Sequence, residues 1–181
     1  GALLKALHPN WTPGQIKSAI MTTAKVQGVV KEDGVTPANA FDFGSGRVDL
    51  NVAGNPGLTF DESADDYVAL QDQLWNANYP SLYIPVMPGR ITVSRTVHNE
   101  LNKKVEWKLD VTAPADVKVT VPRELKIGPN ADATFQITVD AGTVPLGEVR
   151  FATLQLRTSD ISDGKDDGHR DAIDAAGGSN P

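Results

Sequence analysis

The chain has 181 residues, of which 40% are hydrophobic and 22% charged, and its net charge is −6. These values are typical of a globular protein with one domain or two small ones, and no apolar run is long enough to cross a bilayer. The negative net charge argues against a nucleic-acid-binding surface. Because cysteine is absent, disulfides and cysteine-ligated metal sites are excluded, but the cellular compartment stays open.

The first residues predict the end of a buried helix. Residues 2–7 (Ala-Leu-Leu-Lys-Ala-Leu) are apolar except for Lys5, so they should be buried on nearly all sides. Pro9 disfavours the helical backbone for His8 and ends the helix there. We expect His8 to be a helix-end residue rather than a general base, because the helix dipole favours it at that position.

A second helix should begin directly afterwards. Thr12 occupies the N-cap position and Pro13 the first helical position, and Gln15 completes a capping box with the cap residue. Trp11 and Ile16 stand at the two positions of a hydrophobic staple. Apolar residues then recur at helical spacing, so this segment predicts an amphipathic helix.

The run from Gly1 to Ala24 resembles the segment that follows the nucleophile in subtilisin-like serine proteases (subtilases). In that family a Gly-Thr-Ser-Met-Ala motif opens the buried helix, which ends in a run like Ala2-Leu-Leu-Lys5. This chain starts at Gly1, after that motif. The resemblance therefore implies that the catalytic Ser, His and Asp and the oxyanion Asn of the family are missing here, and that the chain is the C-terminal part of a protease. We assign it no catalytic and no cofactor-binding residue.

Two further blocks carry the same resemblance. Phe43-Gly-Ser-Gly-Arg-Val-Asp49 is similar to the element that ends the subtilase catalytic domain, and residues 52–61 are similar to the exit segment of the larger plant and bacterial subtilases. The two glycines of the first block predict a close-packed turn, with Phe41 and Phe43 as apolar anchors. Ser45 lies in this turn without the Gly-x-Ser-x-Gly spacing of a nucleophile elbow, so a structural role is favoured over catalysis.

Residues 61–77 predict a connector with a short helix, because Tyr67, Leu70 and Leu74 recur at helical spacing. The stretch also holds five acidic residues, which could suggest metal ligation. Helical spacing would distribute these carboxylates around the surface, so a solvated face is favoured over a metal site.

From residue 78 onwards apolar and polar residues alternate. The alternating segments are 82–86, 90–97, 104–111, 117–121, 124–127, 133–139 and 150–156. Seven short strands separated by regular turn signals predict a two-sheet sandwich over residues 78–157, with Trp107 in its core. Asn78-Tyr-Pro-Ser81 and Val93-Ser-Arg-Thr-Val97 resemble the opening of the fibronectin type III-like domain that follows the catalytic domain in many subtilases.

Residues 158–181 form an acidic tail with six aspartates against two basic residues, which accounts for −4 of the net charge of −6. Positions 1, 5, 9 and 12 of a loop similar to the EF-hand or dockerin calcium loop are held by Asp163, Asp167, Asp171 and Asp174. However, Lys165 stands at position 3, where a ligating Asp or Asn is expected. A disordered acidic linker is the favoured interpretation, because the stretch lacks core-forming residues.

A complete Ser-His-Asp site would need His8, His98 or His169, since the chain has three histidines, and none has a supporting motif. We expect His98 to be a surface residue at the end of a strand, without an acidic or serine partner at an informative spacing.

The predicted fold class is the helical end of an α/β subtilase catalytic domain (residues 1–60), a connector (61–77), an all-β fibronectin type III-like sandwich (78–157) and the tail (158–181). The resemblance implies that the parent protein is a secreted serine endopeptidase acting on protein or peptide substrates, without a membrane span or a nucleic-acid partner. This fragment would then be structural. The alternative is a non-enzymatic sandwich for adhesion or partner binding, with residues 1–60 as an unrelated appendage. A Gly-Thr-Ser-Met-Ala motif upstream would decide between them.

Overall fold

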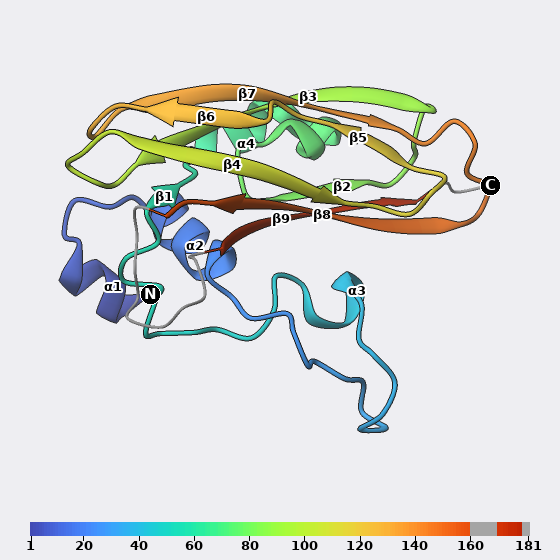
Figure 1. Cartoon of the computed structure of the whole chain (residues 1–181), viewed down its shortest axis with the longest axis horizontal. Coiled ribbons are helices and arrows are strands. Elements are labelled where there is room, and N and C mark those ends of the chain that lie inside the picture. The colour runs from blue at the N-terminus through green and yellow to red at the C-terminus, as the bar shows by residue number, and fades with distance from the viewer. Residues whose placement is uncertain (160–169, 179–181) are drawn as a thin grey trace.

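Two β-sheets lie face to face, and the N-terminal helices lie beside one of their ends (Figure 1). The computed structural model describes residues 1–159 and 170–178. Its helical elements are α1 (Ala2–Leu7), α2 (Pro13–Thr22), α3 (Ala40–Phe43), α4 (Ala64–Leu70) and the 3₁₀ helix η1 (Gln71–Asn76). In this described part of the chain, no helix combines the length and the apolar character that a membrane span requires.

The strands form one sheet of four and one of five. The first has the order β1 (Leu58–Thr59), β3 (Arg90–Asn99), β7 (Asp132–Asp140), β5 (Lys118–Thr120). The second has the order β2 (Ser81–Ile84), β9 (Arg170–Gly178), β8 (Val149–Arg157), β4 (Val105–Thr112), β6 (Glu124–Ile127). All neighbours are antiparallel except β2 and β9, which are parallel. The seven strands predicted from alternation are therefore confirmed, and the sandwich with them.

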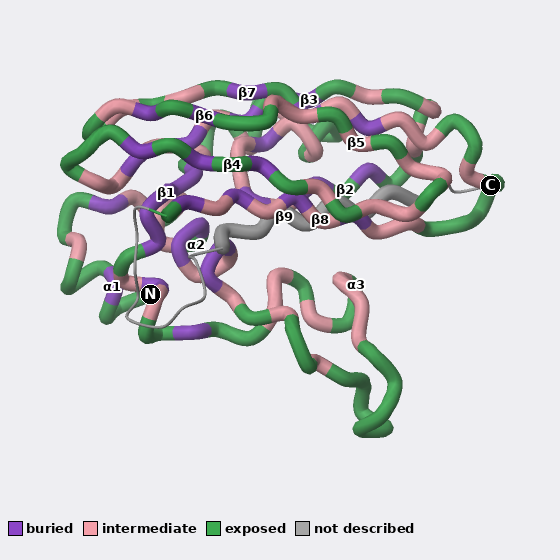
Figure 2. The backbone as a smooth tube through the Cα atoms, in the orientation of Figure 1, coloured by how far each residue is buried: buried purple, intermediate pink, exposed green. Residues whose placement is uncertain are grey.

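The core of the sandwich follows from this alternation. On β4, Val105, Trp107 and Leu109 point inward while the residues between them are exposed. They meet the inward residues of the facing sheet, such as Val93 and Ile137, in one continuous cluster. Figure 2 shows buried residues recurring along the strands and around α2, whereas the loop that carries α3 is mostly exposed. Each large apolar side chain buried in this way stabilises the fold by about 1.5–3 kcal/mol.

The predicted start of α2 is confirmed atom by atom. The hydroxyl of Thr12 accepts a hydrogen bond from the Gln15 amide at 3.0 Å, and the Gln15 side-chain oxygen accepts one from the Thr12 amide at 3.0 Å. Trp11 is buried and packs with Ile16, as expected for a staple. These local contacts satisfy helix N–H groups that have no partner within the helix itself.

The prediction that α1 is buried on nearly all sides is wrong for this chain. Leu4 is buried, but Leu3 is 76% exposed and Leu7 is 62% exposed. Among the described residues, the cluster that receives Leu4 is small: its other buried members are Trp11, Ala19 and Ala53, and Ile16 and Ile20 are partly buried against it. Two leucines of α1 consequently remain on the surface.

The tail also differs from the prediction of a disordered linker. Residues 170–178 form β9, which pairs with β8 along its whole length and with β2 over four residues. This stretch lacks the alternating apolar side chains from which the other strands are predicted. A strand between two neighbours is held by main-chain hydrogen bonds on both sides, and these do not depend on side-chain type.

The loop between α2 and β1 is anchored on the outside of the five-stranded sheet. Phe41 lies edge-on to Phe151 of β8 and Tyr83 of β2, with ring centroids 5.1 Å and 6.0 Å away, so its predicted role as an apolar anchor is confirmed. The predicted turn follows it. Gly46 has a φ of 110°, and a Cβ there would lie 2.7 Å from the carbonyl oxygen of Lys25, so this position requires glycine.

Candidate functional site

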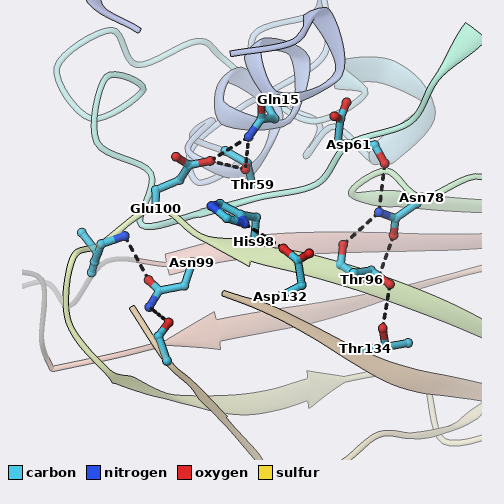
Figure 3. Close-up of polar contacts among 12 residues, drawn as sticks. Gln15, Thr59, Asp61, Asn78, Thr96, His98, Asn99, Glu100, Asp132 and Thr134 are labelled. Carbon is cyan, nitrogen blue, oxygen red and sulfur yellow. Dashed lines mark hydrogen bonds and ion pairs between the residues drawn. The ribbon is translucent and has the colours of Figure 1, made fainter. Parts of the chain in front are cut away.

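The side chain of Glu100, just after β3, joins the helical segment to the sandwich. Its carboxylate accepts hydrogen bonds from Trp11 Nε1 at 2.9 Å, from Gln15 Nε2 at 3.1 Å and from the hydroxyl of Thr59 at 2.5 Å. Figure 3 shows Gln15, Thr59 and Glu100 turned toward one another. One carboxylate thus links the start of α2, strand β1 and the end of β3.

Strand pairing and a further hydrogen bond reinforce this link. Strand β1 pairs with the end of β3, and the amide of Phe60 donates to the hydroxyl of Ser18 on α2 at 2.8 Å. The start of α2 lies very close to the segment that follows β1. A Cβ at Gly14 would lie 2.2 Å from Asp61 Oδ1 and 2.9 Å from the Glu62 amide. A side chain at Gly14 would therefore force α2 away from the sandwich.

Asn78 ties the connector to the middle of β3. Its side-chain oxygen accepts from the Thr96 amide at 2.7 Å, and its side-chain nitrogen donates to the carbonyl oxygens of Asp61 at 3.0 Å and Thr96 at 2.9 Å. Figure 3 shows Asn78 between these two segments. An amide side chain is needed here, because it can donate and accept at once.

Arg95 of β3 is fully buried and holds the connector from inside. Its guanidinium donates to the carbonyl oxygens of Trp75 at 2.9 Å, Tyr79 at 3.2 Å, Ser81 at 3.2 Å and its neighbour Ser94 at 2.9 Å. Burial lowers the pKa of Arg95 to about 10, while Tyr79 and Glu62 act in the opposite direction. The guanidinium therefore keeps its charge at neutral pH, and main-chain dipoles surround it.

We call this set of contacts the polar junction, defined by Gln15, Thr59, Asn78, Arg95 and Glu100. It is a structural assembly rather than a reaction centre, because its hydrogen-bonding groups are occupied by one another and by the main chain. Its evident capacity is to fix the orientation of α2 relative to the sandwich.

The histidines that were considered as catalytic bases have other contacts. His8 caps α1, stacks on Trp11 with ring centroids 3.7 Å apart, and lies 2.7 Å from the Gly54 carbonyl oxygen through Nε2. His98 lies next to the end of β3, as predicted, and there it has an acidic partner. Its Nδ1 lies 2.7 Å from Asp132 Oδ1 on β7, directly across the sheet. Spacing along the chain could not reveal this cross-strand pair.

Ser45 lies in the turn after α3, where the backbone takes the left-handed φ values of 62° at Gly44 and 110° at Gly46. His169 lies outside the described residues. None of the contacts described above joins His8 or His98 to Ser45.

The four aspartates of the candidate calcium loop are divided by the structure. Asp163 and Asp167 lie outside the described residues, and Asp171 and Asp174 belong to strand β9. Among the residues that are described, no cluster of three or more metal-ligating side chains is present.

Sequence reasoning missed Arg95 and Glu100 as key residues. The signal for Arg95 was available, because it stands between Val93 and Val97 on the inward face of a strand. An arginine at an inward position needs internal partners. For Glu100 no such signal exists, since its partners are 41 to 89 residues away in the sequence.

Comparisons with known proteins agree with this architecture. A fibronectin type-III domain model matches residues 76–165. Two Arabidopsis thaliana proteins, the subtilisin-like proteases SBT3.11 and SBT3.1, are each 33% identical to the chain, over 172 residues (76% of the chain) and 176 residues (78%). A third from the same plant, subtilisin-like protease SBT5.4, is 31% identical over 76% of the chain. The chain belongs to the subtilase family.

The matched region is a C-terminal segment of a subtilase, and the chain covers only 23%, 23% and 21% of these three relatives. A solved structure of a FixG-related protein from Vibrio parahaemolyticus is also similar, with a TM-score of 0.41 and 12% identity over 69% of this chain and 96% of that one. The subtilase relatives extend across both the helical segment and the sandwich.

Proposed function

We propose that this chain is the structural C-terminal part of a secreted serine endopeptidase, in which residues 1–60 complete the catalytic domain and the sandwich braces them. The observation that carries this proposal is the set of three hydrogen bonds that Glu100 accepts from Trp11, Gln15 and Thr59. Because Glu100 holds α2 against the sandwich, the sandwich sets the position of α2 for any segment of the protease that packs on the other side of this helix.

The apolar surface of the helical segment supports the same proposal. A groove of about 660 Å³ is lined mainly by apolar residues, among them Trp11, Ile16, Ile20 and Met21, and also by Lys5 and Lys17. Large contiguous apolar surfaces mark interaction sites. In the proposed assembly, the upstream part of the catalytic domain covers this groove, and its catalytic groups bind protein or peptide substrates.

The alternative of a free-standing adhesion module is less favoured. It treats residues 1–60 as unrelated to the sandwich, whereas the subtilase relatives match across both parts and Glu100 joins them. A nucleic-acid partner is not part of the proposal, given the net charge of −6.

Substitution of Glu100 tests the proposal in the full-length protease. We expect Glu100→Ala to lower the free energy of unfolding by about 1.5–3 kcal/mol, because Trp11 and Gln15 lose their charged acceptor. We also expect a smaller fraction of molecules to carry a reactive nucleophile. Thermal unfolding and titration with a serine-directed fluorophosphonate measure the two effects.

Glu106→Ala is the matched control for this experiment. Glu106 is exposed on β4 and forms an ion pair with Lys126 at 3.5 Å, so its removal should change the unfolding free energy by less than about 1 kcal/mol. Equal behaviour of the two variants would contradict a bracing role for Glu100.

The chain by itself should hydrolyse no peptide bond, because the groups that would form a catalytic triad are expected upstream. Incubation of the pure chain with casein and with a fluorophosphonate probe tests this expectation. No serine should be labelled, and Ser45→Ala should behave like the unaltered chain. Stoichiometric labelling that disappears in Ser45→Ala would overturn the assignment of Ser45 to a structural turn.

Calcium should associate with the acidic tail only diffusely. Asp163, Asp167, Asp171 and Asp174 repel one another, and Lys165 occupies a ligand position. On calcium addition, the NMR shifts of residues 163–174 should rise linearly and fade in modest salt. Saturation below about 1 mM, abolished by Asp163→Ala, would instead establish a specific site of the extracellular affinity range.

A further inference from the structure

A cavity of about 170 Å³ opens between the two sheets of the sandwich. It lies at the end of the sandwich away from α1 and α2, where the loops before β3 and after β7 meet (Figure 1). An apolar protein cavity of about 150 Å³ stays dry and accepts a benzene molecule. The volume is therefore suited to a ring or a chain of about six carbon atoms.

The walls of this cavity are mainly apolar and come from both sheets. In the described part of the chain they include Ile84, Met87, Val117, Val139, Val144 and Ala152. Ile84 and Val139 also belong to the core cluster, so the cavity continues the core toward solvent. Water gains few hydrogen bonds on such walls, and an apolar ligand would replace it favourably.

The charged groups at the rim are already paired. Arg150 donates through Nε to Asp116 at 2.8 Å, through one terminal nitrogen to Glu148 at 2.5 Å, and through the other to the Val149 carbonyl oxygen at 3.1 Å. Among the described residues, these three side chains, one guanidinium and two carboxylates, carry a net charge of −1. A ligand carboxylate at the rim would lie next to this negative charge, so anionic ligands are disfavoured.

An exposed apolar side chain stands at the mouth of the cavity. Leu146 lines the cavity and is nevertheless 87% exposed, in the loop between β7 and β8. The neighbouring Gly147 has a φ of 82°, which holds the loop in a tight turn. Leu146 thus offers additional apolar surface to a molecule that protrudes from the cavity.

We propose that this cavity is a binding site for a small apolar molecule with an uncharged or cationic head group. The apolar part enters between the sheets beside Ile84 and Val139, and the head group stays at the rim near Glu148. The site is separate from the polar junction, and it does not depend on the proposed protease function.

Methyl NMR of the unmodified chain tests the proposal with three probes of equal chain length, 1-hexanol, hexylamine and hexanoate. The methyl signals of Ile84, Met87 and Val139 should shift saturably with hexanol and hexylamine, with a Kd on the order of 1 mM for six buried carbon atoms. Hexanoate should bind at least about fivefold more weakly because of the rim charge.

Filling the cavity should abolish the shifts. Val144→Trp places an indole at the lining, whereas Val68→Trp adds the same group at an exposed position of α4 and should leave binding unchanged. The comparison of 1-hexanol, hexylamine and hexanoate uses the unmodified chain, so it tests the proposal even if the Val144→Trp protein does not fold. The absence of saturable shifts, equal binding of hexanoate, or shifts confined to Ile16 and Ile20 would each overturn the proposal.

Discussion

Replacing Arg95 by methionine should lower the free energy of unfolding by about 3–5 kcal/mol, the largest effect that we expect from a single substitution in the polar junction. Methionine fills a similar volume but donates no hydrogen bond. The carbonyl oxygens of Trp75, Tyr79 and Ser81 would then remain buried without their donor. Since Trp75 belongs to η1, Ser81 begins β2 and Tyr79 lies between the two elements, the connector should detach before the sandwich unfolds.

Urea unfolding, followed by intrinsic fluorescence, measures this effect. Arg90→Met is the matched control, because Arg90 is exposed on the same strand and its loss should cost less than about 0.5 kcal/mol. Arg95→Lys should recover only part of the stability, since an ammonium group cannot reach the same set of carbonyl oxygens. If Arg95→Met and Arg90→Met unfold at the same urea concentration, the guanidinium does not hold the connector.

Hydrogen exchange should protect the sandwich far more than α2 in the isolated chain. In the described part of the chain, residues 13–24 rest on a cluster of four buried apolar residues, whereas the strands of residues 78–157 contribute fourteen of the sixteen buried residues of the sandwich cluster. Local opening of the helix therefore exposes little apolar surface and costs little free energy. We expect protection factors in β3, β4 and β7 at least about 100-fold above those in α2.

A variant in the small cluster separates the two regions. Trp11→Ala should reduce the protection of α2 further, because it removes both the buried ring and the hydrogen bond to Glu100. The amides of β3 and β7 should keep their protection, since the sandwich has its own core. Equal protection of residues 13–24 and 78–157, or parallel losses in Trp11→Ala, would show instead that the chain unfolds as one unit.

The sequence by itself determined the elements that depend on near neighbours. The capping box of Thr12 and Gln15, the turn at Gly44 and Gly46, and the seven alternating strands all rest on contacts within a few residues or on a period along one strand. The inward position of Trp107 follows from the same period. Such features are visible in a linear pattern because chain connectivity brings the interacting groups together.

Only the tertiary structure decided which distant groups meet. Glu100 with Thr59 and His98 with Asp132 are pairs that the register of β1, β3 and β7 creates, and a linear pattern carries no register between distant strands. The exposure of Leu3 and Leu7 likewise depends on what packs against α1. Strand β9 forms because β2 and β8 each offer it an edge for main-chain pairing. Whether a side chain is buried, and which distant residue it pairs with, depends on which helices and strands pack together, so both are decided only in the folded chain.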